Sequence, residues 1–116
     1  MAVALQVESS MIANGDSDVH VVVAEGELDI ATLGALQGKL DALVDGTGRR
    51  VLVDLGALEF IDSPAIAALY HASASFAHVA VVVPADSQVA RTLEICGMHE
   101  MLPIFHDRGE ALRALA

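Results

Sequence analysis

Apolar residues near the start of the chain alternate with polar or small ones, as in half-buried strands. Val3, Leu5 and Val7 show this alternation, and a second apolar run covers Val19–Ala24. Between them, Asn14-Gly15-Asp16 is a strong turn signal. The sequence therefore predicts that a β-hairpin opens the chain.

After the second strand the spacing of apolar residues becomes helical. The segment Gly26-Glu27-Leu28-Asp29 is expected to break the strand, with Asp29 as a candidate N-cap. The predicted helix then carries Leu33, Leu36, Leu40 and Leu43. Gly46 and Gly48 are expected to end it.

The rest of the chain alternates between strands and helices. Continuous apolar runs at Val51–Leu55 and Val79–Val83 predict strands covered on both faces, and Pro103-Ile104-Phe105 predicts a short one. This order predicts an α/β fold, with a mixed, mostly covered β-sheet and about four α-helices. At 116 residues the chain is expected to be one domain, residues 1–116.

Capping residues indicate where the later helices begin. Ser63 suits an N-cap and Pro64 the first helical position, where no N–H is needed. Ser87 is expected to cap the next helix, and Asp107 with Glu110 resembles a capping box for the last.

Charge narrows the range of partners. The formal net charge is -10, which repels a phosphate backbone or an anionic lipid surface, so neither nucleic acid nor a membrane is expected as a partner. The first residues have no basic region leading an apolar segment, and no apolar run reaches the length of a membrane span. The protein is therefore expected to be cytoplasmic.

Asp62 and Ser63 stand side by side at a predicted strand-to-helix junction. A phosphate on Ser63 would lie near the positive end of the helix dipole, with the amides of Ala65 and Ile66 expected to be available. From its position alone, the simpler interpretation of Ser63 is a helix cap, because Ser is common there.

Two segments resemble a known family. The stretch from Leu55 to Leu69, with its central Asp-Ser pair, resembles the signature of STAS domains in anti-sigma-factor antagonists. Gly26-Glu27-Leu28-Asp29 is similar to the turn that follows the second strand in that family. The order of elements also matches over nearly the whole chain, so the resemblance implies a STAS-like fold.

The resemblance implies a binding protein of bacterial transcription and stress regulation, without enzyme activity or a cofactor. Ser63 would be the phosphoacceptor. The unphosphorylated form would bind an anti-sigma factor, often itself a serine kinase, and free a sigma factor. Phosphorylation would break the complex, and a metal-dependent serine phosphatase would restore it. Asp62 would orient Ser63 and contact the partner, while Gly26, Glu27 and Asp29 would form the rim of the surface.

The chain departs from this family directly after the phosphoacceptor. The family usually has Ser or Thr and then Gly, whereas Pro64 and Ala65 stand here. Both residues are expected at the partner surface. Pro64 removes one N–H donor, and together the two changes stiffen the segment that a kinase must engage.

Two other functions stay open. One is a STAS adaptor that does not switch, in a signalling assembly or a transporter complex. The other is a small enzyme acting through Ser63, but a nucleophile elbow needs Gly where Ile61 and Ala65 stand.

A metal site is not expected. The histidines are scattered without a metal-binding spacing on one helix: His20, His71, His78, His99 and His106. Asp54, Glu59 and Asp62 are interpreted as solvated turn carboxylates in preference to a metal cluster. Cys96 is expected to be a small buried residue near a helix end.

Overall fold

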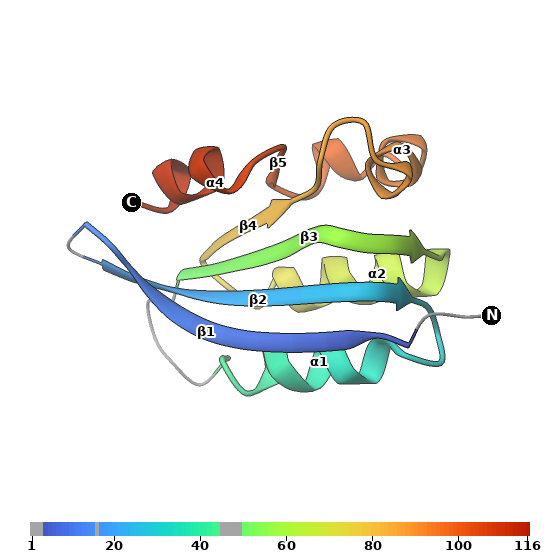
Figure 1. The fold of residues 1–116 in the computed structure, drawn as a ribbon, viewed down its shortest axis with the longest axis horizontal. Helices are drawn as coiled ribbons and strands as arrows, with labels where there is room; N and C mark the ends of the chain where they lie inside the picture. Colours follow the sequence, from blue (N-terminus) through green and yellow to red (C-terminus); the bar gives the residue numbers. More distant parts are fainter. Residues whose placement is uncertain (1–3, 16, 45–49) are drawn as a thin grey trace.

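The sheet has five strands in the order β1-β2-β3-β4-β5 in the computed structural model, which describes residues 4–15, 17–44 and 50–116 (Figure 1). The strands are β1 (Gln6–Asn14), β2 (Ser17–Leu28), β3 (Arg50–Ile61), β4 (His78–Val82) and β5 (Ile104–Phe105). β1 and β2 form an antiparallel hairpin, and the remaining neighbours are parallel. The predicted opening hairpin and mixed sheet are confirmed.

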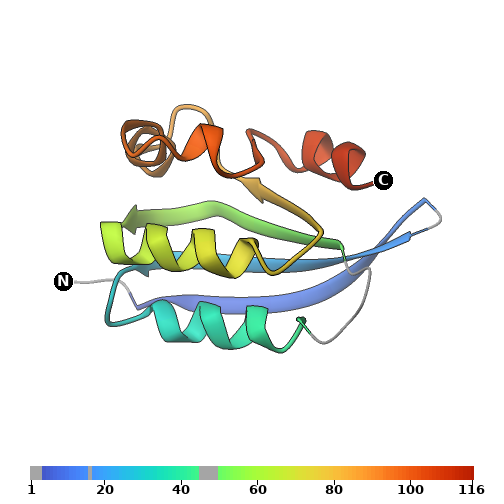
Figure 2. The same ribbon diagram turned by 180° about the vertical axis from the view of Figure 1, so that it is seen from behind.

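Helices cover both faces of this sheet. They are α1 (Leu33–Asp41), α2 (Ser63–Ser73), α3 (Gln88–Ile95) and α4 (Arg108–Leu115), with a 3₁₀ turn at Met98–Glu100. Figure 2 shows α1 and α2 side by side in front of the sheet. Side chains of α1, α2 and α3 share one core with the sheet, and α4 packs with a smaller cluster. The predicted α/β architecture with four helices is thus confirmed.

Alternation along each strand divides the aliphatic side chains between these two cores. In β2, Val22 and Ala24 belong to the larger core, while Val19 and Val21 belong to the α4 cluster. Leu52 of β3 lies with the α4 cluster, between neighbours that face the larger core. This period-2 division explains why residues 21–24 of β2 and 51–53 of β3 are apolar on both faces of the sheet.

Several predicted boundaries were wrong. β2 does not break at residue 26 but continues to Leu28, and β3 extends to Ile61 instead of ending near Leu55. α1 is shorter than predicted, since it ends at Asp41 and leaves Leu43 in the following turn. Residues 3, 16, 46 and 48, which entered the predictions of the first strand, the turn and the helix end, lie outside the described residues.

Two of the predicted helix caps are confirmed. The Ser87 hydroxyl accepts a hydrogen bond from the N–H of Ala90 at 3.1 Å. The Asp107 carboxylate accepts one from the N–H of Glu110 at 2.8 Å, and this bond lowers the pKa of Asp107. Cys96 does follow the end of α3, but it is exposed, so its predicted burial was wrong.

None of the helices in the described ranges is long and apolar enough to cross a membrane.

Candidate functional site: the junction after β2 and β3

The two segments that carried the family resemblance meet in space. β2 and β3 are parallel neighbours, and their ends are in register, with Leu28 opposite Ile61. The residues after both strands therefore leave the same edge of the sheet. The N–H of Asp62 donates to the carbonyl of Leu28 at 3.3 Å, which joins the two segments directly.

The Asp62 carboxylate fixes this junction. Its Oδ1 accepts a hydrogen bond from the N–H of Ala65 at 2.9 Å, which makes Asp62 the N-cap of α2. Its Oδ2 accepts one from the N–H of Ile30 at 3.2 Å. One side chain thus holds the start of α2 and the turn after β2 in a fixed relation.

Ser63 is the first residue of α2 and not its cap, so the predicted capping role was wrong. Asp62 takes that role because its carboxylate reaches the amide three residues ahead. Ser63 is exposed, and its hydroxyl has no hydrogen-bond partner among the described residues. The hydroxyl is consequently open to chemical modification, and no neighbouring base in the described ranges activates it as a nucleophile.

The amides expected to receive a phosphate are already occupied. The N–H of Ala65 donates to Asp62 Oδ1, and the N–H of Ile66 donates to the Asp62 carbonyl at 2.9 Å. Pro64 has no N–H to offer. A phosphate on Ser63 would therefore compete with Asp62 for donors and would add charge beside an existing carboxylate.

Asp29 stabilises the turn after β2 but does not cap α1. Its Oδ1 accepts hydrogen bonds from the N–H groups of Ala31 and Thr32, each at 3.0 Å. Thr32, the N-cap of α1, donates its hydroxyl to the carbonyl of Glu27 at 2.9 Å and accepts from the N–H of Asp29 at 2.9 Å. Thr32 was missed from the sequence, although the Asp-x-x-Thr spacing is the signal of such a reciprocal turn.

Gly26 allows the backbone of β2 to pass close to the start of the chain. Its φ is +106°, and a Cβ there would lie 2.4 Å from the carbonyl oxygen of Ala4. The register of β2 with β3 is irregular on both sides of this residue. The glycine is therefore needed for a close approach within a continuous strand, which explains why the predicted strand break was wrong.

Two exposed apolar side chains near the ends of β2 and β3 were also missed. Ile30, between the hydrogen-bonded residues of the β2–α1 turn, is 70% exposed. Phe60, opposite Glu27 in the sheet, is 42% exposed. An aliphatic residue in a polar turn and an aromatic residue two positions before the Asp-Ser pair were the available signals. We call this region the junction surface: Gly26, Glu27, Asp29, Ile30, Phe60, Asp62, Ser63 and Pro64.

Not every predicted site residue lies on this surface. Ala65 is 1% exposed, and its methyl group packs in the larger core. Gly26 also lines a hollow of about 280 Å³, together with the acidic residues Glu25 and Glu59. The hollow adds acidic character next to the apolar residues.

The carboxylates weighed as a metal cluster do not come together. Asp54 lies in β3, where its Oδ2 pairs with the Arg108 guanidinium of α4 at 2.6 Å, so it is not a turn carboxylate as predicted. Within the described ranges, no group of three or more His, Cys, Asp or Glu side chains is placed to hold a metal ion.

Comparison with known proteins identifies the family. The family model for the STAS domain matches residues 10–111. None of the curated proteins matches the chain by sequence. Similar solved structures include an anti-sigma factor antagonist from Mycobacterium paratuberculosis, at 23% identity and a TM-score of 0.79, covering 95% of this chain and 94% of that one.

Two further structures have the same fold. An anti-sigma-factor antagonist (STAS) domain protein from Planctomyces limnophilus has 22% identity and a TM-score of 0.72, covering 95% of this chain and 97% of that one. The phosphorylated form of the Bacillus cell fate determinant SpoIIAA has 15% identity and a TM-score of 0.64, covering 96% and 100%. Given the match over residues 10–111, the chain belongs to the STAS domain family.

Proposed function

We propose that this protein is an anti-sigma-factor antagonist of the bacterial cytoplasm, which binds an anti-sigma factor through the junction surface and is switched off by phosphorylation of Ser63. The observation that carries the proposal is the exposed hydroxyl of Ser63, which has no partner within the described part of the chain and lies beside a carboxylate that fixes the surrounding backbone. A serine kinase would add the phosphate, and a serine phosphatase would remove it. The protein acts by binding, and Ser63 is a substrate of other enzymes.

Preorganisation supports a binding role. The backbone around Ser63 is held by hydrogen bonds that the Asp62 carboxylate accepts from the N–H groups of Ile30 and Ala65. A partner that docks here need not order the turn after β2. Less of the interaction free energy is therefore lost to the conformational entropy of ordering the backbone. Ile30 and Phe60 supply exposed apolar area near the ends of the two strands, and the acidic residues Glu25 and Glu59 suit a basic side chain of the partner.

Phosphorylation is expected to act at the surface and to leave the fold intact. A phosphate at the first residue of α2 is favourable to the helix dipole. It is unfavourable to a partner, because it adds charge next to Asp62 in a surface that docking removes from water.

We expect Ile30→Ala to weaken binding of the anti-sigma factor about ten-fold, because a central exposed aliphatic side chain loses roughly 1–2 kcal/mol of interface burial. Phe60→Ala is expected to weaken it at least as much, with a thermal melt to confirm folding. Met11→Ala is the matched control, since Met11 is 58% exposed but lies opposite His20 near the hairpin end of β2. Calorimetric titration measures all three, and an equal loss for Met11→Ala would contradict a localised surface.

Pro64→Ser is expected to speed phosphorylation of Ser63 and to change affinity for the kinase only modestly. Pro64 restricts the backbone next to the acceptor, and transfer needs the hydroxyl in line with the γ-phosphate. Single-turnover rates with the cognate kinase measure the effect, and equal rates would show that Pro64 does not limit transfer. Adding Ala65→Gly is expected to lower the free energy of unfolding, because the lost methyl group is buried and glycine is disfavoured in a helix.

Intact mass after incubation with ATP and the serine kinases of the same genome tests the proposed switch. A single phosphate on Ser63, absent from Ser63→Ala, is the expected result. Stable binding of a partner without any phosphate transfer would instead support the adaptor that does not switch.

A further inference from the structure

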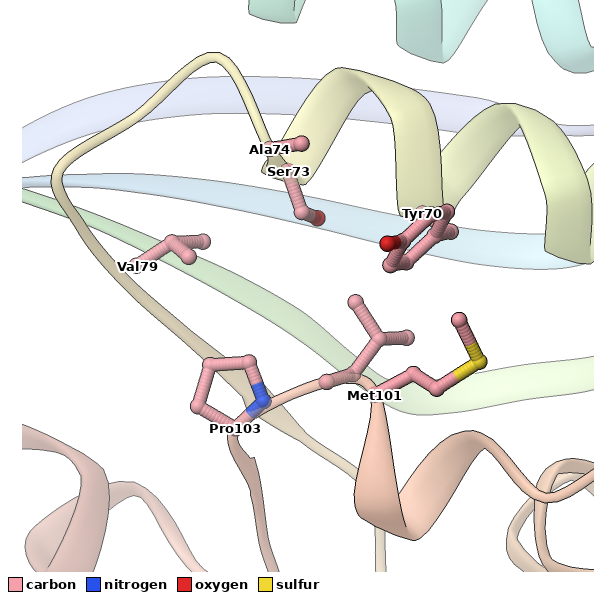
Figure 3. Close-up of a pocket in the computed structure, with 7 residues that line it drawn as sticks. Tyr70, Ser73, Ala74, Val79, Met101 and Pro103 are labelled. Atoms are coloured by element: carbon pink, nitrogen blue, oxygen red, sulfur yellow. The ribbon is translucent and has the colours of Figure 1, made fainter.

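A second hollow lies at the other end of α2, away from Ser63. It has a volume of about 250 Å³ and is bounded by the last turns of α2, the start of β4 and the segment before β5 (Figure 3). Its lining residues are Tyr70, Ser73, Ala74, Val79, Met101, Leu102 and Pro103. It shares none of the residues of the junction surface.

Ser73 gives this pocket an unsatisfied polar group. Its side chain is 4% exposed, and its Oγ has no hydrogen-bond partner among the residues that the structure describes. Figure 3 shows the Ser73 oxygen directed into the space that Tyr70, Val79 and Pro103 surround, with the Tyr70 hydroxyl directed toward the same space. A buried hydroxyl without a partner is unfavourable, so a ligand that hydrogen-bonds to it gains more than it would at an exposed serine.

The remaining lining defines the chemistry of the ligand. Apart from Ser73 and Tyr70 it consists of alkyl, thioether and proline surfaces, and no Asp, Glu, Lys, Arg or His of the described ranges borders the pocket. A charged ligand would lose its hydration there without a compensating charge. Since a cavity of about 150 Å³ holds benzene, a pocket of this volume takes roughly ten non-hydrogen atoms.

We infer that this pocket binds a small uncharged molecule with a compact apolar body and one oxygen that accepts a hydrogen bond from Ser73. Aromatic or alicyclic ketones and alcohols of about ten non-hydrogen atoms belong to this class. The inference does not depend on the proposed function, because neither the pocket nor its lining includes Ser63.

Three probes of nearly equal size test the inference: acetophenone, cumene and benzoate. The first has a neutral oxygen, the second has none and the third is charged. Each is titrated into the whole chain carrying ¹³C-methyl methionine, with Met101 at the pocket as the reporter and Met11 in β1 as the internal control. We expect acetophenone to shift the Met101 methyl signal saturably, cumene to bind at least two-fold more weakly and benzoate to give no saturable shift.

Ser73→Ala distinguishes the contribution of the hydroxyl to ligand binding from that of the apolar walls. We expect it to weaken the binding of acetophenone about two- to ten-fold and to leave the affinity for cumene unchanged. The fold should be kept, because the substitution removes an unsatisfied polar atom. Tyr70→Phe is a second conservative variant, which tests the contribution of the Tyr70 hydroxyl to the binding of acetophenone. Equal affinity for acetophenone and cumene, benzoate binding as tightly as acetophenone, no effect of Ser73→Ala, or no saturable shift with any probe would each overturn the inference.

Discussion

Ser63→Asp is expected to weaken binding of the anti-sigma factor by about two to three orders of magnitude. The new carboxylate would stand beside Asp62 in a surface that the partner covers, and an unpaired charge buried in this way costs roughly 3–5 kcal/mol. Loss of folding would not explain the result, because an acidic residue in the first turn of α2 is favourable to the helix. Calorimetry or surface plasmon resonance with the purified partner measures the change.

Ser63→Ala is the matched control for this substitution. It removes the phosphoacceptor but adds no charge, and the Ser63 hydroxyl makes no hydrogen bond within the described residues that could be lost. We expect its affinity to stay within a few-fold of the wild type. If the Asp variant bound as tightly as the Ala variant, Ser63 would lie outside the contact surface.

Gly26→Ala is expected to lower the free energy of unfolding by about 3 kcal/mol or more. The substitution combines a backbone conformation that costs an alanine roughly 1–3 kcal/mol with a Cβ placed 2.4 Å from the carbonyl oxygen of Ala4. The new Cβ is fixed to the backbone of β2 and the oxygen belongs to the backbone of Ala4, so a change of side-chain rotamer cannot relieve the contact. Denaturant unfolding measures the loss, and partner binding should fall as well, because the start of the chain must move beside the junction surface.

Gly38→Ala, in contrast, is expected to raise the free energy of unfolding. Gly38 lies inside α1, and a Cβ there would meet nothing within 4 Å. An alanine in a helix interior is favoured over glycine by roughly 0.5–1 kcal/mol, so this variant should be more stable than the wild type. Equal effects of Gly26→Ala and Gly38→Ala on the free energy of unfolding would contradict the structural role assigned to Gly26.

The fold could be predicted from the sequence because its core elements carry strong periodic signals. Val51–Leu55 and Val79–Val83 are apolar runs, and Ser87 and Asp107 are clear caps, so the order of elements followed directly. The ends of β2 and β3 could not be predicted, since both strands continue through glycine-containing segments. Gly26 stays in the strand because it pairs with Leu58 of β3, a residue far away in the sequence.

The site was predicted in outline but not in its internal contacts. The residues Asp62 and Ser63 were identified, yet the cap was assigned to Ser63 because both residue types favour that position. Only the structure shows that Asp62 also accepts the N–H of Ile30 from the preceding turn. Ile30 and Phe60 were missed for a related reason, because exposure of an apolar side chain depends on which surfaces the fold leaves uncovered.

We propose that a phosphate on Ser63 controls partner binding at the junction surface. It is tested most directly by titrating the anti-sigma factor into two preparations of the chain, one unmodified and one carrying a phosphate on Ser63 alone, as verified by mass spectrometry. We expect a stoichiometric complex with the unmodified chain and at least about 100-fold weaker binding of the phosphorylated chain, with equal thermal stability of the two. Equal affinity of the two preparations would contradict it.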